Sequence, residues 1–577
     1  MGKVNRREFF EEVVDSQVSL EAKDNKEDAV FKKYANKEIP RGLNKTTSTL
    51  TPYTGPWTKK EIIHLLRRTT FGPKYEDVLY FEKKNMNDAV DELLNVSTTA
   101  PAPPVNNYEN TINDPHGVKY EQTWVNAPYK TTVVNQGTLN SHRRYSFKSW
   151  WINRMINVDR SIQEKMVMFW HNHFATEGVV VTYAQFMYRH NALLRQHALG
   201  NFQTLVKEVT KDTAMLRYLN GHYNTKTAPD ENYARELMEL FTLGKDYKPI
   251  YSENDIKAAA KVLTGWRNNY TTLTSYFSSS AHDTTNKQFS SFFGNKVIFG
   301  KTGTDGAKET DELIDMIFQK QEVARFIVRK LYRYFVYYVI DSNTEADIIT
   351  PLAQDLMFNN FEIKPILTKL LKSEHFFDVL SQACYIKTPL DYVMGTFRTF
   401  DVKLPVNFGT EKTYKIHHYL RYYTSLLNME PNEPPNVAGW PAFYQTPEYY
   451  ETWINSTTLP RRLIFTDMML GSGFSYGTGT AIKVDPMEFA KKFYSPGDPN
   501  LLIDYFSSLL LGLPISSQNK IALKQSTLLS GQTSDYYWTN AWSAYIGNPN
   551  TANTNIVKSR LNGLLIELTR LPEHQLC

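Results

Sequence analysis

Apolar residues recur every three or four positions along most of the chain, which is the spacing of one buried face of an α-helix. The first clear case is residues 62–71, IIHLLRRTTF. Thr58 and Glu61 precede it in the pattern that caps helix N-termini, and Gly72 and Pro73 follow it as a stop signal. The pattern therefore predicts a capped helix that begins just after Thr58.

Between residues 145 and 266 the helix signals are regular. Four capping patterns occur, each followed by a helical run and a glycine that would end the helix. The four pairs and their closing glycines are Ser161/Glu164 with Gly178, Thr182/Gln185 with Gly200, Thr227/Asp230 with Gly244, and Ser252/Asp255 with Gly265. Four such units in succession predict an α-helical core.

Irregular and helical patterns alternate in the rest of the chain. Residues 97–140 are rich in Pro, Asn and Thr, which predicts a long loop, and the Ser, Thr and aromatic residues of 267–300 predict a hairpin or a long loop. Helical periods return over residues 309–402, and final helices end near Leu571. The Pro-rich stretch 428–447 cannot be regular.

These patterns predict a mainly α protein: a large multi-helix globular core with long irregular loops and at most a small β-hairpin. We expect an extended N-terminal arm at residues 1–56 and a helical core at 57–400, with its long loops at 97–140 and 267–300. A C-terminal helical region at 401–577 is expected to pack on that core.

Composition and charge exclude several classes of protein. The net charge is +5, from 65 basic and 60 acidic residues that are interleaved, so no nucleic-acid partner is implied. Two cysteines, Cys384 and Cys577, cannot form a disulfide framework or a cysteine-rich metal site. No run of about eighteen apolar residues occurs, so no membrane span is predicted. Aromatic residues make up 14%, which suits dense packing and also a carbohydrate-facing surface.

Arg6 and Arg7 look like the charged part of a twin-arginine export signal. Such a signal continues with an apolar stretch, whereas Glu11, Glu12 and Asp15 follow here. We therefore expect the two arginines to lie in a solvated N-terminal arm and expect no complete signal peptide in this sequence; export could still occur if the protein is bound to a partner that carries a complete signal.

The most distinctive candidate chemistry is the pair His171 and His173 in MFWHNHFATEG, residues 168–178. Two positions on a helix are about 200° apart around the axis, so the two rings cannot chelate one ion. His173 falls on the apolar stripe and is either a core histidine with a hydrogen-bond partner or a ligand or acid–base group. If one histidine acts, its expected partner is a carboxylate from Glu236 or Glu239.

A second candidate lies in DENYARELMELFTLG, residues 230–244. Asn232, Arg235, Glu236 and Glu239 recur at helical spacing and form a polar stripe opposite an apolar face. This stripe is either a solvated face held by ion pairs of Arg235 with its neighbours, or an inward-facing site in which Glu236 and Glu239 hold a cation with a histidine.

His282 and Asp283 form a third candidate, because an aspartate can orient a histidine for base catalysis, although such dipeptides are common. The chain contains no phosphate-binding loop, dinucleotide fingerprint or His-Glu-x-x-His motif. The common enzyme classes that depend on those motifs are therefore disfavoured.

Several longer stretches resemble the bacterial proteins called domain of unknown function 1800, and in order they span residues 57–577. The stretches are HLLRRTTFG (64–72), EKMVMFWHNHFAT (164–176), LRQHALGNFQTLV (194–206), MLRYLNG (215–221), DENYARELMELFTLG (230–244), SENDIKAAAKVLTGW (252–266), HDTTNK (282–287), ARFIVRKLYRYF (324–335), PPNVAGWP (434–441) and LPEHQLC (571–577).

The resemblance implies a mostly helical protein without an established activity. Its members are often exported and are commonly encoded beside a sulfatase-like family that carries a twin-arginine signal. A periplasmic, cell-surface or secreted location is therefore favoured, with the cytoplasm as the alternative.

Two hypotheses for function follow. In the first, the chain acts with a sulfatase-like partner in glycan processing or surface assembly, with a glycan as ligand. In the second, it is a metal-dependent, hydrolase-like enzyme that holds one divalent ion between helices. The candidate catalytic residues are His171, His173, Arg235 and Glu236; the candidate metal ligands are His171, Glu236 and Glu239; the candidate binding residues are Arg67, Asn232, His282, Asp283 and Trp440.

Overall fold

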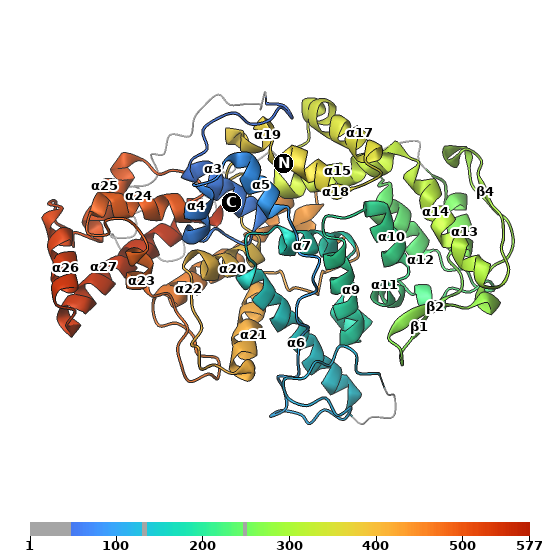
Figure 1. The fold of residues 1–577 in the computed structure, drawn as a ribbon, viewed down its shortest axis with the longest axis horizontal. Helices are drawn as coiled ribbons and strands as arrows, with labels where there is room; N and C mark the ends of the chain where they lie inside the picture. Colours follow the sequence, from blue (N-terminus) through green and yellow to red (C-terminus); the bar gives the residue numbers. More distant parts are fainter. Residues whose placement is uncertain (1–47, 130–134, 246–250) are drawn as a thin grey trace.

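The computed structural model of this chain describes residues 48–129, 135–245 and 251–577. Within those ranges the protein is mainly α-helical, with two small two-stranded antiparallel sheets, which confirms the predicted fold class. The molecule is elongated: the last helices form one end, the strands lie at the other, and the earliest described helices lie between them (Figure 1).

The first part of the chain builds the centre of the molecule. Its helices are α3 (Lys59–Thr69), α4 (Tyr75–Phe81), α5 (Met86–Leu93), α6 (Gln136–Asn157), α7 (Gln163–His173), α8 (Gly178–Val181), α9 (Ala184–Gln196), α10 (Phe202–Thr210), α11 (Thr213–Tyr218), α12 (Asn232–Glu236) and α13 (Glu253–Val262). A π-helix, η2 (Leu237–Thr242), continues α12 directly. The capping boxes at Thr58 and Ser252 both form, as predicted.

The other three predicted capping boxes do not form. No side chain caps α7, α9 or α12, and Thr182 has φ +72°, outside the extended region that a capping residue adopts. The helix expected to run to Gly178 ends at His173. Gly178 lies against residues 432–433, where a Cβ would be 2.3 Å from Asn432 Nδ2, so it permits a close approach and does not end α7. The loop predicted over 97–140 is also shorter at its end, because α6 begins at Gln136.

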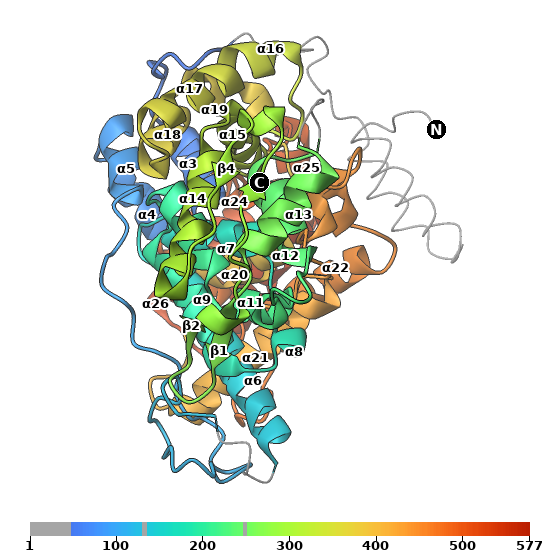
Figure 2. The same ribbon diagram turned by 90° about the vertical axis from the view of Figure 1, so that its right-hand side faces the viewer.

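The segment predicted to be a hairpin or loop holds both sheets. Strands β1 (Trp266–Asn269) and β2 (Thr274–Phe277) pair with Trp266 opposite Phe277, and β3 (Lys287–Gln288) pairs with β4 (Val297–Ile298). The side view in Figure 2 places this segment beside α13 and α14 (Lys308–Phe318).

The remaining helices complete the core and form the far end. They are α15 (Gln321–Phe335), α16 (Ser342–Thr344), α17 (Thr350–Phe358), α18 (Ile363–Leu371), α19 (Glu374–Phe377), α20 (Pro389–Thr399), α21 (Thr410–Leu426), α22 (Thr458–Leu470), α23 (Pro486–Lys491), α24 (Pro499–Leu510), α25 (Ser517–Ser526), α26 (Tyr536–Gly547) and α27 (Thr551–Arg570). None of the helices in the described ranges combines the length and apolar character needed to cross a bilayer.

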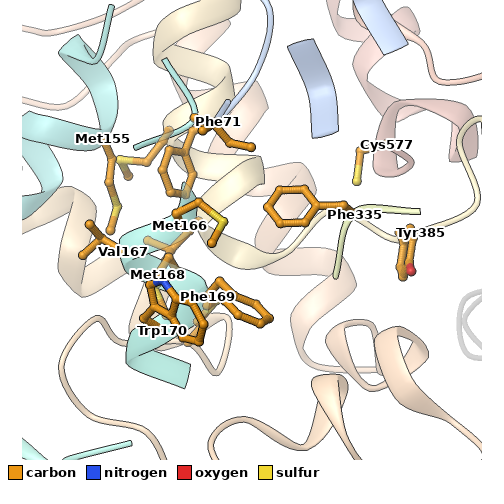
Figure 3. Close-up of a cluster of buried hydrophobic side chains, with 14 of the residues drawn as sticks. Phe71, Met155, Met166, Val167, Met168, Phe169, Trp170, Phe335, Tyr385 and Cys577 are labelled. Carbon is orange, nitrogen blue, oxygen red and sulfur yellow. The ribbon is translucent and has the colours of Figure 1, made fainter. Parts of the chain in front are cut away.

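Two helices are buried on all sides and mark the centre of the core. Every residue of α20 is buried, and so is every residue of α7 except half-buried Asn172. A helix that is apolar around its whole circumference must be covered by other elements on every side. Figure 3 shows Met166, Phe169 and Trp170 of α7 among the apolar side chains that surround it. Most of the expected N-terminal arm, residues 1–47 with Arg6 and Arg7, lies outside the described residues.

Candidate functional site

The three residues at the C-terminus of α7 contact three different parts of the molecule. His173 donates from Nε2 to the carbonyl oxygen of Phe241, 3.1 Å away. Its Nδ1 accepts from the ammonium of Lys330, 3.1 Å away, because an ammonium can only donate. Burial, together with Lys330, holds the pKa of His173 well below its usual range, so the ring is neutral. His173 therefore joins α7 to the π-helix and to α15.

His171 lies on a different side of α7. Its ring contacts Trp151 edge-on with centroids 5.3 Å apart, and the rings of Trp440 and His190 lie at 5.9 and 6.4 Å. Its Nε2 is buried without a hydrogen-bond partner. Burial, with His190 and Lys148 nearby, lowers the pKa of His171 to about 3. The two histidines thus occupy separate environments, as expected for positions two apart on a helix.

Asn172 contacts the loop that carries Trp440. The backbone N–H of Trp440 donates to Asn172 Oδ1 over 2.9 Å. Gly439 has φ +89°, and a Cβ there would lie 2.3 Å from Asn172 Oδ1 and 2.6 Å from its carbonyl oxygen. Only glycine fits such a position without strain. The stretches EKMVMFWHNHFAT and PPNVAGWP, far apart in sequence, are therefore packed directly together.

The polar stripe of residues 232–239 faces outward for the most part. Asn232 is exposed, while Arg235, Glu236 and Glu239 are half-buried. Arg235 pairs with Glu231 at 3.2 Å and with Glu239 at 3.5 Å, the i,i+4 pairs of a solvated face. Burial, with Glu239 nearby, raises the pKa of Glu236.

The predicted metal ligands are not brought together. No group of three or more His, Cys, Asp or Glu side chains in residues 48–129, 135–245 and 251–577 is arranged to hold a metal ion. The physical reason is that His171 faces tryptophan rings and His173 contacts the π-helix through a backbone carbonyl, while Glu239 is paired with Arg235 and Lys245. The donor set expected from His171, Glu236 and Glu239 therefore does not fit a metal.

His282 and Asp283 have different partners from those the dipeptide suggested. His282 Nε2 bonds to Glu309 Oε1 at 3.0 Å, and Glu309 Oε2 accepts from Lys287 at 2.6 Å, all three side chains being buried. Burial alone would raise the pKa of Glu309, but the hydrogen bonds from His282 and Lys287 outweigh it and lower that pKa. Asp283 accepts from the backbone N–H of Thr285. This buried network holds the strand segment to α14.

A cavity, called the first cavity below, opens beside the outer face of α7. It lies between α7, α15, residues 385–391 and the loop 438–453, and the space between its lining atoms, open solvent included, is about 830 Å³. Four cationic side chains and one carboxylate line it: Arg68, Lys165, Lys330, Arg333 and Asp391. Nine aromatic side chains also line it, among them Tyr385, Tyr449 and Trp453. Tyr385 lies across Phe335 from α7 in Figure 3.

The cations of the first cavity differ in how they are satisfied. Lys165 forms a buried ion pair with Asp391. Arg68 donates to the carbonyl oxygens of Phe335 and Tyr334 over 2.9 and 2.7 Å. Arg333 lies over the ring of Tyr449 at 5.5 Å, and its Nε is buried without a hydrogen-bond partner.

Of the candidate residues predicted from the sequence, His173 lines this cavity, whereas none of the cations that line it was predicted. Lys330, Arg333 and Tyr334 stand at i, i+3 and i+4 within ARFIVRKLYRYF, which is the signal that could have indicated a shared polar face. Arg67 lines a second, smaller cavity nearby.

Five of the stretches that carry the family resemblance contribute side chains to the first cavity. They contribute Arg68 from HLLRRTTFG, His173 from EKMVMFWHNHFAT, Arg333 from ARFIVRKLYRYF, Ala438 from PPNVAGWP and Cys577 from LPEHQLC. The cavity is thus the place where distant motifs meet.

Comparisons with known proteins agree with the resemblance. No curated protein and no solved structure matches the chain. The family model described as "Protein of unknown function (DUF1800)" matches residues 64–575, nearly the whole length. The chain therefore belongs to the DUF1800 family.

Proposed function

We propose that this protein binds an anionic saccharide in the first cavity. The single observation that carries the proposal is the lining: nine aromatic and four cationic side chains with one carboxylate. Apolar walls with a few placed polar groups are the usual form of a small-ligand site.

Charge supports an anionic ligand. The one lining carboxylate, Asp391, is already paired with Lys165 and accepts from Thr388 Oγ1 over 2.9 Å. In the described ranges the guanidinium of Arg333 lies over the Tyr449 ring and forms no ion pair with a carboxylate, so it is the side chain best able to bind a carboxylate or sulfate. A charge-assisted hydrogen bond to a guanidinium is about twice as strong as a neutral one.

The aromatic wall supports a ring-shaped, partly apolar ligand. Tyr338, Tyr385 and Tyr450 form one contiguous group, with ring centroids 4.7–6.2 Å apart. Trp453 continues the wall through Phe443, 5.8 Å away. The flat, weakly polar faces of such rings pack against the C–H faces of a sugar.

The experiment compares matched charged and neutral sugars by calorimetry on the full chain. We expect glucose 6-sulfate and glucuronate to bind at least about tenfold more tightly than glucose, because a hydrogen bond to a charged group contributes about 1.5–3 kcal/mol. Arg333→Met should abolish this preference. Arg325→Met is the matched control, since Arg325 lies in the same helix and does not line the cavity. Equal affinity for charged and neutral sugars, or an unaffected Arg333→Met variant, would contradict the proposal.

A sulfatase-like partner and an exported location form the wider part of the proposal. Their support is the resemblance to a family encoded beside sulfatase-like proteins, and an anionic-sugar site would give both proteins the same class of ligand. Capture of the tagged chain from native membranes or medium should return a sulfatase-like protein. Its absence counts against this part and leaves the cavity proposal standing.

The metal-dependent alternative has weaker support, because its expected ligands do not come together. Elemental analysis of the purified protein tests it directly. Stoichiometric metal that is lost in Glu236→Ala would favour it. No stoichiometric metal, with sugar binding retained in Glu236→Ala, would end it.

A further inference from the structure

A second cavity lies on the other side of Asp391 and Cys577, which line both cavities. It encloses about 430 Å³ between α3, α20, the end of α24 and residues 572–575. Gly72 and Gly395 lie on its wall, where α20 approaches the chain so closely that a Cβ on Gly72 would be 2.8 Å from the Gly395 Cα. The space suits an ion better than a sugar.

Two cations line this second cavity without a carboxylate partner. Arg67 is 9% exposed and donates Nη2 only to backbone oxygens, those of Leu509 at 2.9 Å and Ser508 at 3.5 Å. Lys387 also lines the cavity. Among the described residues, no Asp or Glu lies within ion-pair distance of either side chain.

A third cation lies directly behind Lys387. Arg462 is fully buried and donates Nη2 to the backbone oxygen of Lys387 over 2.9 Å. Its Nε and Nη1 are buried with no hydrogen-bond partner. A buried charge without an opposite charge nearby costs several kcal/mol.

The neighbouring groups offset this charge only in part: Cys577 and Asp391 favour the charged forms of Lys387 and Arg462 but form no ion pair with either. Asp391 is paired with Lys165, and His574, which bonds through Nδ1 to the oxygen of Leu510, has a pKa held well below its usual range by burial and by Lys387. Burial and Arg67 lower the pKa of Lys387 to about 7, and burial lowers the pKa values of Arg67 and Arg462 to about 10. At Lys387 the positive charges of Arg67 and Arg462 add to the effect of burial, while Cys577 and Asp391 oppose it. At Arg67 and Arg462 burial alone lowers the pKa.

We propose that the second cavity is a binding site for a small inorganic oxyanion, of the sulfate or phosphate type, held by Arg67 and Lys387. Such an ion has several acceptor oxygens and can accept from a guanidinium and an ammonium together. Bound there, it would balance the charges that the protein leaves unpaired. The site is separate from the saccharide site and does not rest on the proposed function.

The test uses the full chain in a buffer free of sulfate and phosphate, with sodium sulfate and sodium phosphate as probes. Calorimetry and thermal unfolding should both detect binding, with the unfolding temperature rising as either anion is added. Lys387→Met should weaken binding at least about tenfold, since it removes a charge-assisted hydrogen bond. Lys364→Met is the control, because Lys364 is exposed and distant from the cavity lining.

A second measurement keeps the proposal testable if Lys387→Met fails to fold. The pKa of Lys387, followed by NMR on protein with isotopically methylated lysines, should rise from about 7 when sulfate is added. No binding at tens of millimolar anion, or equal binding by wild type and Lys387→Met, overturns the proposal. So does stabilisation by bicarbonate alone, which would indicate carbamate formation on the Lys387 amine in place of oxyanion binding.

Discussion

Replacing Gly439 by alanine should destabilise the protein by closing the gap between the Trp440 loop and α7. The added Cβ would lie 2.3 Å from Asn172 Oδ1 and 2.6 Å from the Asn172 carbonyl oxygen. Both distances are far inside van der Waals contact, and one of the two atoms is backbone that cannot turn away. The loop would have to move, and the hydrogen bond from Trp440 N–H to Asn172 would lengthen or break.

The size of the effect follows from three contributions. A non-glycine residue at φ +89° costs about 1–2 kcal/mol, overpacking of a tight contact costs about 1–3 kcal/mol, and the lost hydrogen bond about 1 kcal/mol. The free energy of unfolding should therefore fall by about 3–6 kcal/mol. Gly479→Ala is the control, because Gly479 has φ +75° with open space around its Cβ position, so only the first contribution applies.

Urea unfolding followed by tryptophan fluorescence measures both variants, since the shift in midpoint multiplied by the slope m gives the change in free energy. Gly439→Ala should cost about 2–4 kcal/mol more than Gly479→Ala. A difference smaller than about 1 kcal/mol would refute the tight contact between the two motifs. A normal affinity for anionic sugars in Gly439→Ala would further indicate that the loop position does not shape the first cavity.

Three further predictions test other parts of the structure. The pKa of His171 in the folded state is about 3, below the ordinary 6.5, so its contribution to stability is complete above pH 6.5 and falls by about 3 kcal/mol by pH 4.5. His171→Phe should flatten the pH profile of stability by about one proton, and an unchanged slope contradicts this. Lys165→Met leaves the buried Asp391 unpaired and should lower the free energy of unfolding, measured in urea, by about 3–5 kcal/mol. Lys491→Met removes an exposed ion pair and should lower it by less than about 1 kcal/mol. Similar losses in the two variants would argue against burial as the cause. Thr58→Ala removes the cap of α3 and should cost about 1 kcal/mol by the same assay, and no loss would mean that the capping box contributes nothing.

Local sequence patterns predicted those features that local interactions determine. The caps at Thr58 and Ser252 depend on residues three positions apart, and both form. The same rule failed at Thr182, whose φ of +72° is imposed by the turn between α8 and α9. The π-helix at Leu237–Thr242 was not predicted, because its extra residue per turn leaves no mark in the apolar spacing.

The candidate site was harder to predict because its contacts join distant residues. His173 was identified, and its bond to a backbone oxygen is one of the alternatives considered from sequence. Its particular partner, Phe241, lies 68 positions away, and the Lys165–Asp391 pair spans 226 positions. No periodicity encodes such pairings. The cations of the first cavity line a common space only because the loop 438–453 forms its other wall.

The contact between Arg68 and Cys577 has a consequence for how the protein becomes active. Arg68 Nη1 lies 3.5 Å from Cys577 Sγ across 509 positions of sequence, and both residues line the first cavity. A wall made from segments so far apart cannot exist in a partly folded chain, and pairing over such long separations makes folding slow. Ligand binding would then report that folding is complete. A ligand in the cavity would also hold the first and last described helical segments together, and so oppose the opening of either end.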